Sequence, residues 1–134
     1  MQSGGRDVLR LTLPPDAGCT LNDGWLHLWS HDRYVDVWLV RGATSVDEAV
    51  ARVPQEIRHE FEKFKPTTTT ALTVSGTAAT RIVGTGVEAD DGDAGDADVI
   101  VFKLGQHVFV ACTHGEGLSA ASQEWMLTLV QTAR

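Results

Sequence analysis

The sequence predicts an α+β fold, an α/β/α sandwich in which about seven mostly antiparallel strands form one sheet with a helix on each face. Three observations lead to this prediction. Two segments carry apolar residues at helical spacing, several β-branched runs end at Gly or Pro, and two runs near the C-terminus are apolar on both faces. The predicted order is β-ββ-α-ββ-ββ-α within a single domain, residues 1–134.

The first predicted strand is DVLRLTL, residues 7–13, which alternates between apolar and polar residues and stops at two prolines. We interpret the following PPDAGCTLNDG as a loop. The next segment, WLHLWSHDRYVDVWLV at residues 25–40, predicts a hairpin with a two-residue turn at Asp32-Arg33.

This turn sets the pairing between the two strands of the predicted hairpin. The expected pairs are His31–Tyr34, Trp29–Asp36, His27–Trp38 and Trp25–Val40. Because side chains alternate along a strand, one face of the hairpin then carries a mainly aliphatic set and the other an aromatic and histidine set.

The first predicted helix begins at Ser45, where Ser45 and Glu48 form a capping-box pattern. Pro54 lies inside the helical pattern and predicts a kink or a break near Val53. Pro66 marks the predicted exit from this segment. The apolar stripe expected to face the sheet is Val46, Val50, Val53, Ile57, Phe61 and Phe64.

The second half of the chain predicts four strands and a closing helix. TTTTALTVS and ATRIVGTGVE are joined at Ser75-Gly76, while ADVIVFKL and HVFVACTH are joined at Gly105-Gln106 and are expected at the centre of the sheet. LSAASQEWMLTLVQTA predicts the last helix, with Ser119 as its cap. The residues expected to face the sheet are Leu118, Ala121, Trp125 and Leu129.

The charge is concentrated in one segment. The net charge is −7, and six of the eighteen acids lie in EADDGDAGDAD, residues 88–98. Outside this segment the chain has twelve acids and eleven Lys and Arg residues, so it is near neutral there. No basic stripe is available to bind phosphates, and no nucleic-acid partner is expected.

The acidic segment 88–98 could be a cation site, an interaction segment or a polar turn. A helix–loop–helix calcium pattern starting at Asp91 fails at Gly95, Asp96 and Phe102. Small residues and mutual repulsion instead predict a mobile, solvated connector between two strands, with weak cation binding as the alternative.

The compartment stays open at this level. No apolar run approaches the ~20 residues of a spanning helix. Cys19 and Cys112 match no zinc or redox spacing, and they form one disulfide if the protein is exported or two buried thiols otherwise. The opening MQSGGRD has no signal peptide. If it replaces a removed leader the protein is exported or envelope-associated, and otherwise it is cytoplasmic.

The aromatic face of the hairpin is the candidate binding site. Trp and His rings at this density could form a shelf for an apolar or cationic group, with imidazoles for hydrogen bonds or metal. The alternative is that a helix covers the face and the rings are core. The candidate binding residues are Trp25, His27, Trp29, His31, Tyr34 and Trp38.

No metal, cofactor or catalytic centre is expected. His27 and His31 lie about 13 Å apart on a straight strand at ~3.3 Å per residue, too far to share a metal. Cys112 and His114 would need two further ligands, so a buried thiol and a histidine at the rim are expected. No nucleophile elbow, metalloprotease motif or phosphate loop is present, and Gly84-Thr85-Gly86 predicts a bulge or bend.

Several segments together resemble the PsbP-like α/β/α sandwich superfamily. They are GWLHLWSHDRYVDVWLV, the helix opening SVDEAV, the turn and strand SGTAATR, and FKLGQHVFV leading into EWMLTL. The resemblance covers nearly the whole chain. The superfamily includes a branch of bacterial lipoproteins and effector chaperones. It implies mainly non-enzymatic binding and assembly proteins, whereas the acid-rich turn departs from the pattern.

Two functions follow as expectations. The first is a non-enzymatic binding or assembly module that presents the rim of the sheet, including the hairpin tip at residues 31–34 and the acidic turn, to a protein partner. The second is a small-ligand or metal-binding protein that uses the Trp/His sheet face. The second predicts that at least one of Trp25, Trp29 and Trp38 is accessible to solvent.

Overall fold

A computed structural model describes residues 2–3 and 6–134 of the chain. Its main feature is a seven-stranded antiparallel sheet with the strand order β3-β4-β5-β9-β8-β7-β6. A short hairpin of β1 (Gln2–Ser3) and β2 (Arg6–Asp7) precedes it. The strands of the main sheet are β3 (Gly18–Asn22), β4 (Trp25–Ser30), β5 (Arg33–Leu39), β6 (Phe61–Val74), β7 (Thr77–Glu88), β8 (Ala94–Leu104) and β9 (His107–Gly115).

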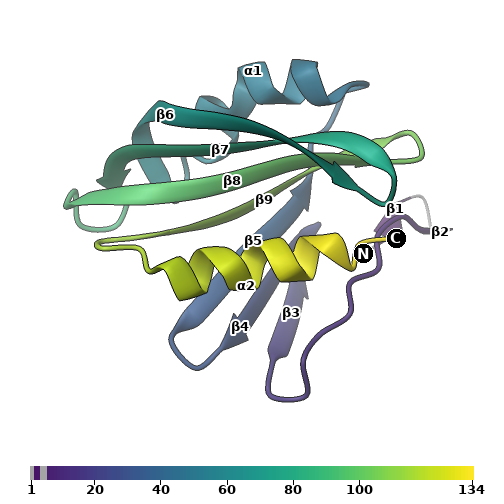
Figure 1. Cartoon of the computed structure of the whole chain (residues 1–134), viewed down its shortest axis with the longest axis horizontal. Helices are drawn as coiled ribbons and strands as arrows, with labels where there is room; N and C mark the ends of the chain where they lie inside the picture. The colour runs from purple at the N-terminus through teal and green to yellow at the C-terminus, as the bar shows by residue number, and fades with distance from the viewer. Residues whose placement is uncertain (1, 4–5) are drawn as a thin grey trace.

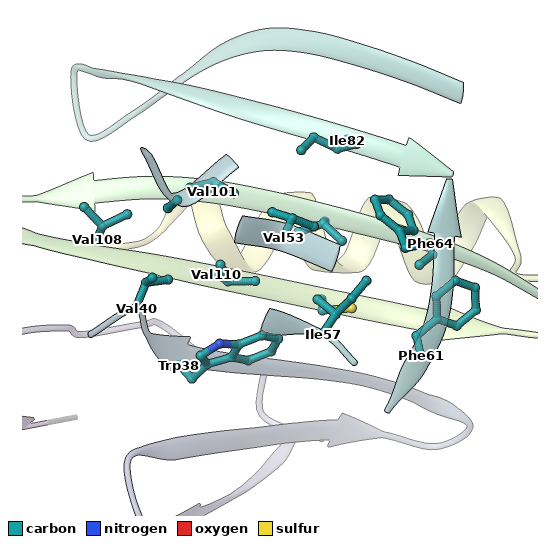
Figure 2. Packing of buried hydrophobic residues seen from close by; sticks show 14 of the residues in the cluster. Trp38, Val40, Val53, Ile57, Phe61, Phe64, Ile82, Val101, Val108 and Val110 are labelled. Carbon is teal, nitrogen blue, oxygen red and sulfur yellow. The ribbon is translucent and has the colours of Figure 1, made fainter. Parts of the chain in front are cut away.

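Two helices, α1 (Val46–Glu56) and α2 (Ala120–Gln131), cover opposite faces of this sheet (Figure 1). The predicted α+β sandwich is therefore confirmed. The central strands β8 and β9 are buried on both faces, as their apolar sequences predict. Neither helix is long and apolar enough to cross a membrane. The α1-side core includes Trp38, Val53, Ile57, Phe61, Phe64, Ile82, Val101 and Val110 (Figure 2), and the α2-side core includes Leu28, Val37, Ile100, Phe102, Phe109, Met126 and Leu129.

Helix α1 starts as predicted and ends earlier. The Glu48 amide donates to Ser45 Oγ at 3.1 Å, while the Glu48 carboxylate accepts from the Thr44 amide at 3.0 Å. The predicted break near Val53 is wrong, because the helix runs through Pro54 and ends at Glu56. Pro54 has no amide hydrogen, so the helix loses one hydrogen bond there. The loss is tolerated because Pro54 lies in the last turn and only two residues of the helix follow it.

Phe61 and Phe64 extend the helical spacing of α1 in the sequence but lie in strand β6, so their assignment to the helix is wrong. Residues three apart on a regular strand point to opposite faces. Here a register shift between Glu62 and Lys65, with Lys63 at φ 56°, turns both rings into the α1-side core. A bulged strand thus imitates the spacing of a helix.

Pro66 lies inside β6 and does not mark the exit from a helix, which corrects that prediction. Strand β6 is an edge strand that pairs only with β7, so a residue without an amide hydrogen is tolerated on its outer side. The irregularity expected at Gly84-Thr85-Gly86 lies in the opposite strand β6, since β7 pairs with β8 in continuous register through these residues. A Cβ at Gly84 would lie 2.3 Å from Lys65 O, and one at Gly86 would lie 2.5 Å from Glu62 O.

The N-terminal strand assignment is wrong. Residues 8–13 have no strand pairing, and the first strand of the sheet is β3, inside the predicted loop. The alternation of 8–13 has another use, because Leu9 is buried and its apolar neighbours pack against the α2-side core. Arg10 exchanges two backbone hydrogen bonds with Arg134, at 2.8 and 3.1 Å.

The hairpin β4–β5 forms with a different register. The turn is His31-Asp32, with His31 at φ 56°, and not Asp32-Arg33. The pairs observed include Trp25–Trp38, His27–Asp36 and Trp29–Tyr34. The error is a shift of two positions along the strand, which equals the strand period, so both predicted faces keep their members except His31, which lies in the turn.

The connector between the two strands is shorter than the predicted residues 88–98. Glu88 ends β7, β8 begins at Ala94, and only residues 89–93 form the turn. Glu88 and Asp98 are buried. Asp98 receives hydrogen bonds from the Arg81 guanidinium at 3.0 and 3.2 Å, so these two acids are structural and not solvated.

Helix α2 begins at its predicted cap, where Ser119 Oγ accepts from the Ser122 amide at 3.1 Å. Its buried face differs from the predicted one. Leu129 is buried as expected and the half-buried Trp125 packs against the α2-side core, but Ala121 is exposed. The helix is rotated so that Met126 and Val130 fill the core.

Candidate functional site

The inner half of the aromatic face is covered, as the core alternative predicts. The rings of Trp25 and Trp38 stack with centroids 4.1 Å apart. Trp38 is buried beneath α1 and donates from Nε1 to Glu56 Oε1 at 3.3 Å. The His59 ring meets Trp25 edge-on at 4.2 Å. This part of the face is packed between the sheet and the end of the helix.

The outer half of the same face is open. Trp29 keeps 39% of its surface exposed, and the His27 ring lies 5.6 Å from it in a stacked arrangement. Gly18 on β3 makes room for the indole, because a Cβ there would lie 2.6 Å from Trp29 Cζ2. One accessible tryptophan is therefore present, with an imidazole beside it.

His31 does not belong to this face. It lies in the hairpin turn with 82% of its side chain exposed, and its Nε2 is 3.5 Å from an oxygen of Asp16. The shift in register moves His31 out of the strand and into the turn. The structure thus brings together five of the six predicted residues and excludes His31.

Beside the stacked tryptophans lies a cluster of ionisable side chains that the sequence did not reveal. We define the His/carboxylate cluster by its members His27, Asp36, His59, Glu60, Glu88 and His114. They come from β4, β5, the turn after α1, the end of β7 and the end of β9. Glu88 and His114 lie at the ends of their strands, His59 and Glu60 lie just past the C-terminal end of α1, and His27 and Asp36 lie within β4 and β5.

His114 is held between two carboxylates. Its Nδ1 contacts Glu88 Oε2 at 2.5 Å, and its Nε2 faces Glu60 Oε1 at 3.5 Å. The Tyr34 hydroxyl donates to the His114 backbone carbonyl at 2.9 Å, and the Phe61 ring flanks the imidazole at 5.6 Å. The side chain of His114 is only 10% exposed, so its orientation is fixed on every side.

Glu60 is the centre of the cluster. Its Oε1 faces His114 Nε2 at 3.5 Å, its Oε2 lies 3.3 Å from His59 Nε2, and its charge acts on Asp36. Asp36 in turn contacts His27 Nδ1. Despite these neighbours, Oε1 of Glu60 and Oε1 of Glu88 are buried without a hydrogen-bond partner among the described residues.

The pKa values of the two central carboxyl groups, Asp36 and Glu60, are shifted in opposite directions. Burial, and then the neighbouring Glu60 carboxylate, raise the pKa of Asp36 to about 6. Burial would also raise the pKa of Glu60, but hydrogen bonds with His59 and Asp36 and the charge of His114 hold it below its usual range. The pKa of His59 is raised, first by its hydrogen bond to Glu60. Of these two carboxyl groups, Asp36 is therefore the one that binds a proton first as the pH falls.

The two cysteines lie on opposite faces of the sheet and are both free thiols. Cys112 is buried on the α1 side, where burial raises the pKa of its thiol well above the usual value. Cys19 is exposed on β3 and borders an apolar groove with Leu26 and Leu28 on the α2 side. The disulfide considered from the sequence is thus not formed.

A second group of acids lies in the turn beyond β7. Carboxylate oxygens of Asp91, Asp93 and Glu116 lie within 4.8 Å of one another and all three side chains are exposed. A hydrogen bond and the charge of Asp93 raise the pKa of Glu116. Exposed acids of this kind occur in many proteins without a cation, and nothing else at the turn points to a ligand.

Sequence patterns could not reveal the His/carboxylate cluster because its members are separated by long stretches of chain. His59 and Glu60 lie in a segment predicted as helix, and Glu88 lies in one predicted as a solvated connector. Asp36 was placed on the correct face, and His114 was assigned to the rim. The only local signal is an acid at the end of a predicted strand, and such an acid does not indicate which residues it contacts.

No protein-family model and no curated protein sequence matches the chain. Solved structures do match it in fold. One is LpqN, a Mycobacterium tuberculosis protein involved in cell envelope biogenesis, with 12% identity and a TM-score of 0.57 over 92% of this chain and 79% of that chain. Another is PA94 of Pseudomonas aeruginosa, a protein of unknown function, with 11% identity and a TM-score of 0.51 over 92% of this chain and 78% of that chain. At these identities the chain shares the sandwich fold with both proteins, and its kinship with PsbP-like proteins stays a resemblance.

Proposed function

We propose that this protein is a non-enzymatic assembly module that binds a partner protein along the free edge of β3 and the neighbouring aromatic residues. The observation that supports this most is the state of that edge. Strand β3 pairs with β4 on one side, and no described strand pairs with its other side. An unpaired edge presents backbone donors and acceptors to which an extended segment of a partner can add.

The opposite edge of the sheet shows how a strand is protected from such pairing. Strand β6 carries two register shifts, Pro66, and the lysines Lys63 and Lys65. Bulges, proline and lysine all disfavour edge-to-edge association. Strand β3, with the sequence GCTLN, has a regular register and none of these features.

The side chains around β3 fit an interface. Leu21 on β3 is 50% exposed and Trp29 on β4 is 39% exposed, and they are the exposed large hydrophobic residues of the described chain. They lie on opposite faces of the sheet beside the β3 edge, because Leu21 pairs with Leu26 and Trp29 with Gly18. Tryptophan is enriched at the energetic centres of interfaces. The proposed interface also includes the hairpin tip at residues 31–32, which belongs to the rim expected from the sequence.

The fold similarity to LpqN supports a location at the cell envelope for this role. LpqN is involved in cell envelope biogenesis, and we extend to this chain the proposal of an envelope-associated assembly role. That extension agrees with the lipoprotein branch implied by the PsbP-like resemblance. The absence of a catalytic motif agrees with a binding role.

Photo-crosslinking in the source cells tests this proposal. A photoreactive amino acid at Leu21 is expected to give one discrete adduct, and the same residue at Thr68 on the protected edge serves as the matched control. Thr20→Lys, which places a charge on the β3 edge, is expected to remove the adduct while Thr68→Lys leaves it in place. Equal labelling from both edges, or an adduct insensitive to Thr20→Lys, would contradict the proposal.

A second candidate function rests on the open half of the aromatic face. His27 and Trp29 form a half-exposed stacked pair beside Trp25, which suits a flat or cationic small ligand. A ligand bound there changes the Trp29 fluorescence. Trp29→Phe is expected to abolish that change, whereas a ligand signal that survives in Trp29→Phe would exclude this surface.

A further inference from the structure

We infer that His114 is a buried imidazolium ion that holds the turn after α1 against the ends of β7 and β9, and that this turn opens when the imidazolium loses its proton. The turn comprises residues 57–60 and carries His59 and Glu60. This pH-sensitive contact is separate from the partner surface proposed at β3, so either proposal can fail alone.

The atoms around the His114 ring indicate which of its nitrogens carry a proton. Nδ1 contacts Glu88 Oε2 at 2.5 Å, while Nε2 lies 3.1 Å from the Tyr34 hydroxyl oxygen and 3.5 Å from Glu60 Oε1. The Tyr34 hydroxyl donates its hydrogen to the His114 backbone carbonyl at 2.9 Å, so its oxygen can only accept from the ring. Both nitrogens therefore face acceptors, and only the imidazolium form has an N–H on each of them.

The charge of His114 stabilises two buried carboxylates. Oε1 of Glu60 and Oε1 of Glu88 are buried and accept no hydrogen bond from the described residues. Buried carboxylates that lose a positive partner are strongly unfavourable. Burial raises the pKa of the Cys112 thiol and of the Tyr34 phenol, so both stay neutral at neutral pH. The ionisable groups around His114 and its carboxylates are Glu88 from β7, Glu60 and His59 from the turn, Asp36 and Tyr34 from β5, and Cys112 from β9.

The turn can open without unfolding the core. Ile57 and Phe61, at its two ends, are fully buried in the α1-side core (Figure 2). Between these anchors, the Glu60 carboxylate faces His114 and the Glu60 carbonyl accepts from the Ala89 amide at 3.2 Å. A neutral His114 that keeps its proton on Nδ1 for Glu88 presents a lone pair to the Glu60 carboxylate. This repulsion replaces the attraction that holds the turn in place.

Opening of the turn uncovers the stacked tryptophans. The His59 ring meets Trp25 edge-on at 4.2 Å and Trp38 at 5.5 Å. Trp29, at the outer end of the same face, is already exposed. Displacement of His59 therefore extends the open half of the aromatic face toward Trp25, and the proton on His114 controls how much of this face is accessible.

The direction of the pH dependence follows from the sign of each proton equilibrium. The imidazolium form belongs to the acid side, so the contact is lost as pH rises. Burial raises the pKa of Asp36 to about 6, and the hydrogen bond to Glu60 raises that of His59. Stability from a raised pKa is present below the ordinary value and is lost as pH rises through the folded value, so both act in the same direction. Despite burial, the neighbouring histidines lower the pKa of Glu60, and its contribution is lost only in acid, below the ordinary value of 4.5.

Nuclear magnetic resonance of the full-length protein labelled with nitrogen-15 in its histidines tests the protonation state. At about pH 7.5 an ordinary imidazole with a pKa of about 6.5 is mostly neutral. Both ring nitrogens of His114 are nevertheless expected at the chemical shift of protonated nitrogen. His114→Gln assigns the signal, and through-bond correlation to the backbone assigns it if that variant does not fold. A neutral tautomer of His114 at this pH would overturn the inference, whether or not Glu88 carries the proton.

Hydrogen exchange measured residue by residue tests the opening of the turn. The Ala89 amide, which donates to the Glu60 carbonyl, is expected to lose protection as pH rises from about 6 to about 9. The expected loss is at least about tenfold, the change in an opening equilibrium for each pH unit over which one proton is lost. The Val110 amide in the central strand β9 is expected to keep its protection.

Two substitutions of the same kind separate this contact from a general effect of charge. Glu88→Gln keeps the size of the side chain but removes the charge at His114 Nδ1, so protection of the Ala89 amide is expected to be lost at a lower pH. Glu116→Gln changes an exposed acid two residues beyond His114 and is expected to leave the pH dependence unchanged. Constant protection of the Ala89 amide across this range, or an equal shift in both variants, would also overturn the inference.

Discussion

The Asp98 carboxylate shows how a single residue can depend on a single partner. It is fully buried in β8, and the Arg81 guanidinium from β7 binds both of its oxygens. A buried charge without its partner is strongly unfavourable, even where the intact pair adds little net stability. The sequence placed both residues on strands but could not show that they meet.

Arg81→Met is therefore expected to destabilise the protein by about 3 kcal/mol or more, measured by urea denaturation. Adding Asp98→Leu to this variant is expected to recover much of the loss, because it removes the unpaired charge. Arg52→Met, which breaks an exposed pair with Glu48 on α1, is the control and is expected to change stability little. Equal losses from Arg81→Met and Arg52→Met would contradict this account.

Tyr34 is the only tyrosine and reports on the rim of the sheet. Burial, followed by the charges of Glu60 and Glu88, raises its pKa well above the ordinary value. The unfolded chain thus loses the phenolic proton at a lower pH than the folded one. Stability from this group is complete below the unfolded pKa of about 10 and falls as pH rises beyond it.

An alkaline titration followed by phenolate absorbance and circular dichroism checks this prediction. The phenolate is expected to appear only together with unfolding. Tyr34→Phe is expected to remove this part of the pH dependence and to lose the hydrogen bond to the His114 carbonyl. A phenolate that forms with a midpoint near 10 while the fold is intact would show that Tyr34 is not held as described.

At the scale of elements, the contact between β6 and β7 depends on two glycines. Rings of Phe61 and Phe64 and carbonyls of the bulged strand cross β7 at Gly84 and Gly86, where any side chain would collide with them. The Gly-Thr-Gly pattern in the sequence indicated an irregular strand. Which neighbour required the irregularity was not predictable, because that depends on the bulges in β6.

Gly84→Ala is expected to lower the free energy of unfolding by about 1–3 kcal/mol, the usual cost of overpacking. The new Cβ would meet Lys65 O, a backbone atom that cannot move aside easily. Gly115→Ala is the matched control, since nothing lies within 4 Å of a Cβ at that position. Thermal unfolding of both variants measures the difference, and a neutral Gly84→Ala would mean that β6 shifts freely.

Elements with one clear periodicity were predictable, and elements whose pattern has two explanations were not. The Ser45 and Ser119 caps, the central strands β8 and β9, and the turn at Gly105-Gln106 follow from local chemistry. The segment 8–13 and the phenylalanines of β6 have spacings that fit both a regular element and an irregular packed segment. For these only tertiary contacts decide.

For the whole molecule, hydropathy was enough to predict a sheet between two helices, because each apolar face must be covered. The same reasoning found the face that carries Trp25, His27, Trp29, Tyr34 and Trp38. It could not find the His/carboxylate cluster, since Glu60, Glu88 and His114 converge only through the order of strands in the sheet. Strand order depends on long-range pairing, which no single sequence displays.

The backbone exchange between Arg10 and Arg134 has a practical consequence for engineering the chain. Two segments from opposite ends of the sequence are fastened side by side, so a short linker could join them without crossing the sheet. We expect a circular permutant that is opened at the exposed turn Gly105-Gln106 to fold with the same circular dichroism spectrum.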